Sequence, residues 1–99
     1  MEIKIQSIHF DATEKLEAFV EKKIAKLEKT FEDIQKVDVQ CKVVKPATAQ
    51  NKEVGMTVSV PGTTLFVEKV SDTFEESCDL CVDSMRVQLQ KFKEKLRNR

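Results

Sequence analysis

The chain has 99 residues, of which 40% are hydrophobic and 34% are charged, and its 17 basic side chains balance its 17 acidic ones. This size and composition predict one domain with an apolar core and a highly charged surface, and no apolar run approaches the ~20 residues that span a bilayer. The first residues do not resemble a signal peptide, and three cysteines without an export signal are typical of reduced cytoplasmic thiols. We therefore expect a single cytoplasmic domain over residues 1–99 that has no membrane partner.

The first part of the chain predicts a strand followed by a helix. Ile3 and Ile5 alternate with polar residues, as in a short strand with one polar face. Apolar residues then recur at helical spacing from about residue 12 to about residue 30. Two N-caps are possible for this helix: Asp11, which would form a capping box with Glu14, and Thr13.

The middle of the chain predicts three strands in succession. Apolar and polar residues alternate over residues 37–43 and again over residues 54–60. The intervening residues 45–52 are polar and include a proline, so we expect a mobile hairpin loop there. Pro61-Gly62 is typical of a tight turn, and residues 64–70 then form the third strand.

A long apolar stripe predicts a final helix. The stripe runs from Phe74 to Leu96 in steps of three and four residues, and either Ser71 or Asp72 is expected to open the helix. The resulting order is β-α-β-β-β-α, in which the first β-α-β unit implies a parallel strand pair. We predict an α+β fold of two layers, a mixed four-stranded sheet with two helices packed on one face and the other face exposed.

The charges are sorted along the chain, although they cancel in total. Residues 86–99 contain six basic side chains and one acid, whereas residues 68–83 contain six acids and one lysine. On the first helix, acids and lysines occupy opposite flanks of the apolar face, so each flank is a row of one sign rather than a set of ordinary ion pairs. Lys23 falls inside the apolar arc beside Phe19, where its stem can pack while the ammonium group reaches solvent.

We predict that the lysine flank of the first helix and the basic end of the second form one surface that binds phosphates, because a polyanion responds to the local field rather than to net charge. Cations in a last helical turn also complement the helix dipole, but this does not explain Arg86, which lies further in. The acids Glu75, Glu76, Asp79 and Asp83 at the far end of the second helix would orient a polyanion by repelling it. The candidate nucleic-acid-binding residues are Lys22, Lys23, Lys26, Lys29, Arg86, Lys91, Lys93, Lys95 and Arg97.

No residue pattern indicates catalysis. Cys78 and Cys81 form a C-x-x-C, but both lie on the apolar stripe within the helix, so we expect core packing rather than redox chemistry. Zinc needs about four ligands, and beyond the three cysteines there is only His9, for which we expect a loop or packing role. We therefore expect no catalytic residues, no metal, no cofactor and no small-molecule substrate.

Five ordered runs carry a resemblance that covers essentially the whole chain. They are SIHFDAT at 7–13, KIAKLEK at 23–29, VDV at 37–39, VPGTTL at 60–65 and QLQKFKEKL at 88–96. With these runs the chain resembles the ribosome hibernation promoting factor and ribosome-associated inhibitor A family, also labelled ribosomal subunit interface or sigma factor modulation proteins.

The resemblance implies the same β-α-β-β-β-α fold and a role at the ribosome. Family members bind rRNA in the decoding channel of the small subunit and block mRNA and tRNA in stationary or starved bacterial cells. The resemblance also implies that basic side chains of both helices contact rRNA. The matching positions here are Lys23, Lys26, Lys91, Lys93 and Lys95.

The chain differs from the family on the second helix and in length. The family often has a lysine at the position of Ser84 and an arginine at the position of Val87. Arg86, at the neighbouring position, could substitute for that arginine. Because the sequence stops after the predicted second helix, we expect no C-terminal domain of the kind with which long members dimerise ribosomes. The resemblance is therefore to the short form, which works with a separate dimerisation factor or inactivates single ribosomes.

Together these features predict a non-enzymatic ribosome hibernation factor that is a monomer off the ribosome. One alternative is a regulatory protein-interaction module that uses the open sheet face or the outward strip formed by Leu80 and Val87. This strip is also consistent with an ordinary pair of surface residues. Another alternative is a protein that binds free duplex RNA.

Overall fold

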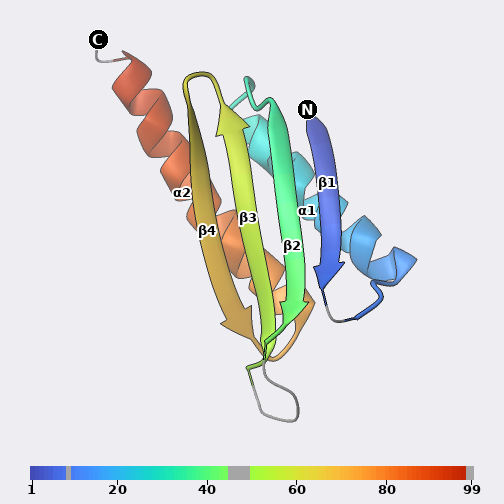
Figure 1. The fold of residues 1–99 in the computed structure, drawn as a ribbon. Coiled ribbons are helices and arrows are strands. Elements are labelled where there is room, and N and C mark those ends of the chain that lie inside the picture. The colour runs from blue at the N-terminus through green and yellow to red at the C-terminus, as the bar shows by residue number, and fades with distance from the viewer. Residues whose placement is uncertain (9, 45–49, 98–99) are drawn as a thin grey trace.

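Four strands and two helices follow one another in the predicted order (Figure 1). The structure is a computed structural model, and it describes residues 1–8, 10–44 and 50–97. The elements are β1 (Glu2–Ile8), α1 (Glu14–Thr30), β2 (Lys36–Val43), β3 (Lys52–Val60), β4 (Thr63–Ser71) and α2 (Phe74–Arg97). The predicted role of His9 and most of the predicted loop, residues 45–49, lie outside the described residues.

The strands pair in chain order, β1-β2-β3-β4. β1 and β2 are parallel, as the β-α-β unit predicted, and the other two pairs are antiparallel. Figure 1 shows both helices behind the same face of the sheet, with α1 nearer β1 and β2 and α2 nearer β4. This confirms the predicted α+β fold of two layers with a mixed sheet.

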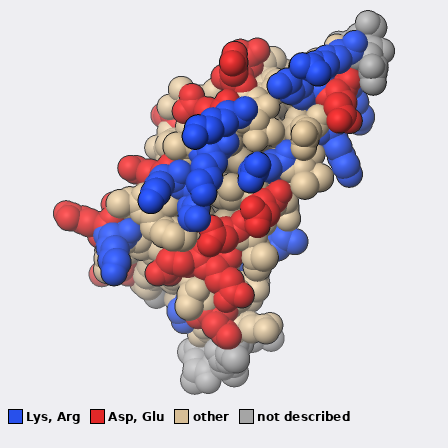
Figure 2. Space-filling model, turned by 180° about the vertical axis from the view of Figure 1, so that it is seen from behind, with Lys and Arg blue, Asp and Glu red and all other residues tan. Residues whose placement is uncertain are grey.

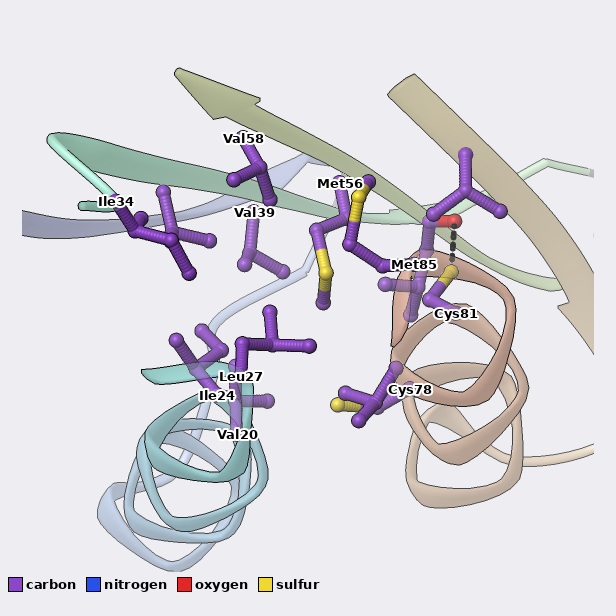
Figure 3. Packing of buried hydrophobic residues seen from close by; sticks show 14 of the residues in the cluster. Val20, Ile24, Leu27, Ile34, Val39, Met56, Val58, Cys78, Cys81 and Met85 are labelled. Carbon is purple, nitrogen blue, oxygen red and sulfur yellow. Dashed lines mark hydrogen bonds between the residues drawn. The ribbon is translucent and has the colours of Figure 1, made fainter. Parts of the chain in front are cut away.

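The core fills the space between the sheet and the helices (Figure 3). Alternation on the strands turns side chains such as Val39, Met56 and Val58 toward the helices, where they are fully buried. The helical spacing of Val20, Ile24 and Leu27 on α1 forms the facing surface. This packing determines the rotation of each helix about its axis, and therefore which charged residues face solvent.

All three cysteines belong to this core, as predicted for Cys78 and Cys81. They are buried free thiols, and the Sγ of Cys81 donates a hydrogen bond to the carbonyl oxygen of Val54 at 3.1 Å (Figure 3). Burial raises the pKa of Cys78 and Cys81 to about 12 and that of Cys41 to about 11. The thiols are therefore protonated at neutral pH and unsuited to nucleophilic or redox chemistry.

A threonine caps α1. The Oγ1 of Thr13 accepts a hydrogen bond from the backbone N–H of Leu16 at 3.1 Å, and Thr13 has an extended backbone. Of the two candidates for this N-cap, the structure therefore selects Thr13 and not Asp11. The helix begins at Glu14, two residues later than expected.

A threonine also opens α2, where the sequence predicted Ser71 or Asp72. The Oγ1 of Thr73 accepts from the backbone N–H of Glu76 at 3.1 Å. The prediction of Ser71 or Asp72 is wrong because Ser71 is the last residue of β4 and both side chains have other partners. The hydroxyl of Ser71 lies 2.7 Å from that of the buried Ser77, and the Oδ1 of Asp72 accepts from the backbone N–H of Gln50 at 2.7 Å.

Two phenylalanine pairs hold the helices together. Phe10 stacks on Phe74 at the beginning of α2, with ring centroids 4.5 Å apart. Phe31, just after α1, packs edge-to-face on Phe92 with centroids 5.5 Å apart. The two helices therefore run in the same direction, and the basic end of α2 extends beyond the end of α1 (Figure 1).

Candidate nucleic-acid interface

Basic and acidic side chains gather on different parts of the helix layer. Figure 2 shows this face, with basic side chains in a band across the middle and toward the C-terminal end. Acidic side chains lie on both sides of that band and dominate the area below it. The sorting of charge along the sequence is therefore preserved as a separation of charge on one face of the molecule.

The lysine flank of α1 faces solvent. Lys22, Lys26 and Lys29 are all exposed, because they lie outside the arc of the helix that holds its buried residues. The ammonium groups of such an exposed row are accessible to the phosphates of a polyanion. The structure thus places these three predicted residues together on one accessible surface.

Lys23 differs from its neighbours because it already has an anionic partner. Its Nζ lies 3.0 Å from the Oδ1 of Asp79 on α2, and the exposed fractions of the two side chains are 22% and 47%. The Nζ also lies 5.3 Å from the centroid of the Phe19 ring, as the predicted position beside Phe19 suggested. The hydrogen bond with Asp79 raises the pKa of Lys23.

The basic parts of the two helices meet near the end of α1. Lys29 and Lys93 line one hollow of about 280 Å³, so the lysine flank and the basic end of α2 adjoin as predicted. Glu32 and Asp33 line the same hollow. The junction is consequently mixed in charge.

The basic residues of α2 divide between two sides of the helix. Arg86 and Lys93 are seven residues apart and Arg97 follows four later, so these three share the side that faces α1. Lys91 and Lys95, four residues apart, lie on the side nearer β4. The prediction of a single two-helix surface did not anticipate this division, and Arg99 lies outside the described residues.

A hollow between β4 and α2 contains residues that the sequence prediction missed. It measures about 210 Å³ and is lined by Leu65, Gln88, Lys91, Phe92 and Lys95. Leu65 comes from β4 and the others from α2, so no local pattern could indicate that they meet. We call these five residues the β4–α2 hollow.

The acids of α2 lie toward its N-terminal half, as predicted. Glu75, Glu76 and Asp83 are exposed, whereas Asp79 points to Lys23. The outward strip is also exposed, with fractions of 41% for Leu80 and 52% for Val87.

Other site types find little support in the described part of the chain. There, no group of three or more histidine, cysteine or acidic residues is arranged to hold a metal ion. None of the helices described is long and apolar enough to cross a membrane.

The fold and the charged helix layer define the chain as a small two-layer α+β domain with a basic surface. Residues 3–97 match the Sigma 54 modulation protein / S30EA ribosomal protein family, and the chain belongs to this family. This confirms the resemblance inferred from the five sequence runs.

Two relatives are informative. The chain is 34% identical over 97 residues to a ribosome hibernation promotion factor from Picosynechococcus, and the aligned region covers 96% of this chain and 50% of that protein. It is 30% identical over 95 residues to a ribosome hibernation promoting factor from Pseudomonas putida, covering 96% of this chain and 89% of that protein. The chain thus spans about half the length of the first relative and most of the second.

Two solved structures share the fold. One is a ribosomal subunit interface protein from Coxiella burnetii, with a TM-score of 0.84 and 23% identity over 95% of this chain and 99% of that one. The other is the N-terminal domain of Protein Y from Thermus thermophilus, with a TM-score of 0.79 and 22% identity over 93% of this chain and 99% of that one.

Proposed function

We propose that this chain is a non-enzymatic ribosome hibernation factor of the cytoplasm. In this proposal it binds small-subunit rRNA at the decoding channel through the helix layer and excludes mRNA and tRNA by occupying their path. The observation that carries the proposal is the exposed basic band on the helix layer, found in a chain that belongs to this family. The names of its relatives, ribosome hibernation promotion and promoting factor, support the same role.

The contacts proposed are mainly to phosphates. Lysine and arginine side chains at helical spacing follow the backbone of a folded RNA and recognise its shape, because they do not read base edges in a deep and narrow A-form major groove. Binding should therefore weaken steeply as salt concentration rises, since each neutralised phosphate releases counterions. Lys22, Lys26 and Lys29, which are all exposed, are the proposed phosphate contacts on α1.

The test is co-sedimentation with purified small subunits over a series of salt concentrations. Replacing Lys22, Lys26 and Lys29 with alanine should lower the slope of log affinity against log salt by about three, one per lost contact. The matched control replaces Lys4, Lys36 and Lys42 with alanine, which removes the same charge from the open sheet face. The control should keep the full slope. Failure of the unaltered chain to pellet at low salt, or an equal loss in both variants, would contradict the proposal.

A second candidate is a protein-interaction module. The exposure of Leu80 and Val87 on α2, and of Phe66 on the open sheet face, favours it. Nuclease treatment of a lysate separates the two functions, because it should release the chain from heavy particles only if RNA holds it there. A monomer in the released fraction, measured by analytical ultracentrifugation, is expected under the first proposal.

A further inference from the structure

The β4–α2 hollow combines apolar walls with a basic rim. Leu65 and Phe92 are half-buried, and the edge-to-face contact with Phe31 holds the Phe92 ring in place. Lys91 and Lys95 are exposed on the same side of α2. We propose that this hollow binds a single unpaired base of an RNA, with the neighbouring phosphates on the two lysines. The inference rests on the proposed function, since it assigns a base contact to an otherwise phosphate-binding surface.

The walls suit the flat face of a base. Unpaired RNA bases bind proteins by stacking on aromatic or apolar side chains, and every base has such a face. A hollow lined by a phenylalanine and a leucine offers this contact without reading sequence. The hollow is therefore suited to an unstacked nucleotide rather than to a paired one.

Gln88 adds a polar group to the same wall. Its Nε2 donates a hydrogen bond to the carbonyl oxygen of Phe66 on β4 at 3.1 Å, which holds the side chain across the gap between α2 and the edge strand. The Oε1 of the same amide remains able to accept a hydrogen bond from an N–H group of a base. A stacked base would thus meet both an apolar face and a positioned acceptor.

The charge of the rim indicates which ligand the hollow takes. Among the described residues, those that line the β4–α2 hollow include two lysines and no acid. The hollow at the junction of the helices differs, because Glu32 and Asp33 line it and would repel a phosphate. Charge complementarity therefore favours a nucleotide in the β4–α2 hollow.

The absence of tryptophan and tyrosine from the sequence permits a direct test. The F92W variant has one fluorophore, placed in the wall of the hollow. We expect a short oligoadenylate to quench its emission by stacking, and an abasic oligomer of the same length and charge to quench it several-fold less. The matched control is F66W, because Phe66 is on β4 but points to the open sheet face and is 57% exposed. Its emission should change little with either oligomer.

The unaltered chain provides a second readout, which does not depend on how F92W folds. An oligomer that contains photoreactive 4-thiouridine should crosslink to Leu65 or to residues 88–95, as mapped by mass spectrometry. Equal quenching of F92W by the abasic oligomer, or crosslinks elsewhere on the helix layer, would overturn the inference. Because these assays use free oligomers and not small subunits, a failure of the base contact can be distinguished from a failure of the proposed function, which co-sedimentation tests.

Discussion

Lys23 and Lys26 lie one helical turn apart, but they are not equivalent as phosphate contacts. Lys26 is exposed, whereas the ammonium group of Lys23 is paired with Asp79 at 3.0 Å. A phosphate that approached Lys23 would have to displace this carboxylate or accept its repulsion. We therefore expect Lys23 to contribute less to RNA binding than its neighbours on α1.

Asp79→Asn should release Lys23 for a phosphate. The variant is expected to bind small subunits more tightly and to steepen the log–log salt slope by about one. Asp83→Asn is the matched control, since it removes the same charge one turn along α2 from an exposed side chain. It should raise affinity through reduced repulsion without changing the slope. Identical slopes for the two variants, measured by co-sedimentation, would show that Lys23 is not restrained by Asp79.

The three buried cysteines make the stability of the packing between α2 and the sheet depend on pH. Cys78 and Cys81 lie on the buried stripe of α2, and Cys41 lies on β2 against the same core. Burial raises their pKa values from the ordinary 9.0 to about 11 for Cys41 and about 12 for the other two. The unfolded chain therefore loses thiol protons at a lower pH than the folded chain does.

The contribution of these thiols to the free energy of unfolding should consequently be constant below about pH 9. It should fall above that pH, as the thiols of the unfolded chain ionise. The expected loss between about pH 8 and about pH 10 is on the order of 1 kcal/mol per buried thiol. Urea unfolding followed by circular dichroism measures it. A variant with alanine at all three positions should be less stable at every pH but lack this part of the decline. A decline of the same size in that variant would assign it to other groups.

The separation of charge over the whole molecule makes the two ends of the helix layer electrostatically different. Basic side chains lie toward the C-terminal end of α2 and acids toward its beginning, so a polyanion is attracted at one end and repelled at the other (Figure 2). Repulsion of this kind limits binding to partners that match the basic end alone. We expect the acids to contribute to the choice of partner more than to affinity.

Replacing Glu75, Glu76 and Asp83 with their amides should therefore raise affinity for free duplex RNA more than affinity for small subunits. The ratio of the two affinities, measured by competition at one salt concentration, is expected to move several-fold toward duplex RNA. The matched control neutralises Glu17, Glu21 and Glu28 on the acidic flank of α1, which removes the same charge from outside the basic band. A control that shifted the ratio equally would indicate an effect of net charge alone.

Periodicity was sufficient to predict the order of elements, the two layers and the buried position of Cys78 and Cys81. The hydrophobic periods of two residues in a strand and 3.6 residues in a helix arise from the backbone geometry. They can therefore be recognised within a few neighbouring residues of the sequence. The N-cap of α2 was not predictable in this way. Ser71, Asp72 and Thr73 are all suitable caps, but Ser71 is the last residue of β4, and Asp72 accepts a hydrogen bond from the backbone of Gln50, which is 22 residues away in the chain.

The same distinction applies to the surface. The helical spacing of apolar residues was sufficient to predict the lysine flank of α1. The exposure of Lys22, Lys26 and Lys29 follows from the spacing of the buried residues on that one helix. Only the packing of separate elements pairs Lys23 with Asp79 and brings Leu65 and Phe92 to one hollow. Ion pairs and hollows depend on distances of a few ångströms between residues that are far apart in the chain, and those distances are established by the shared core rather than by any local pattern.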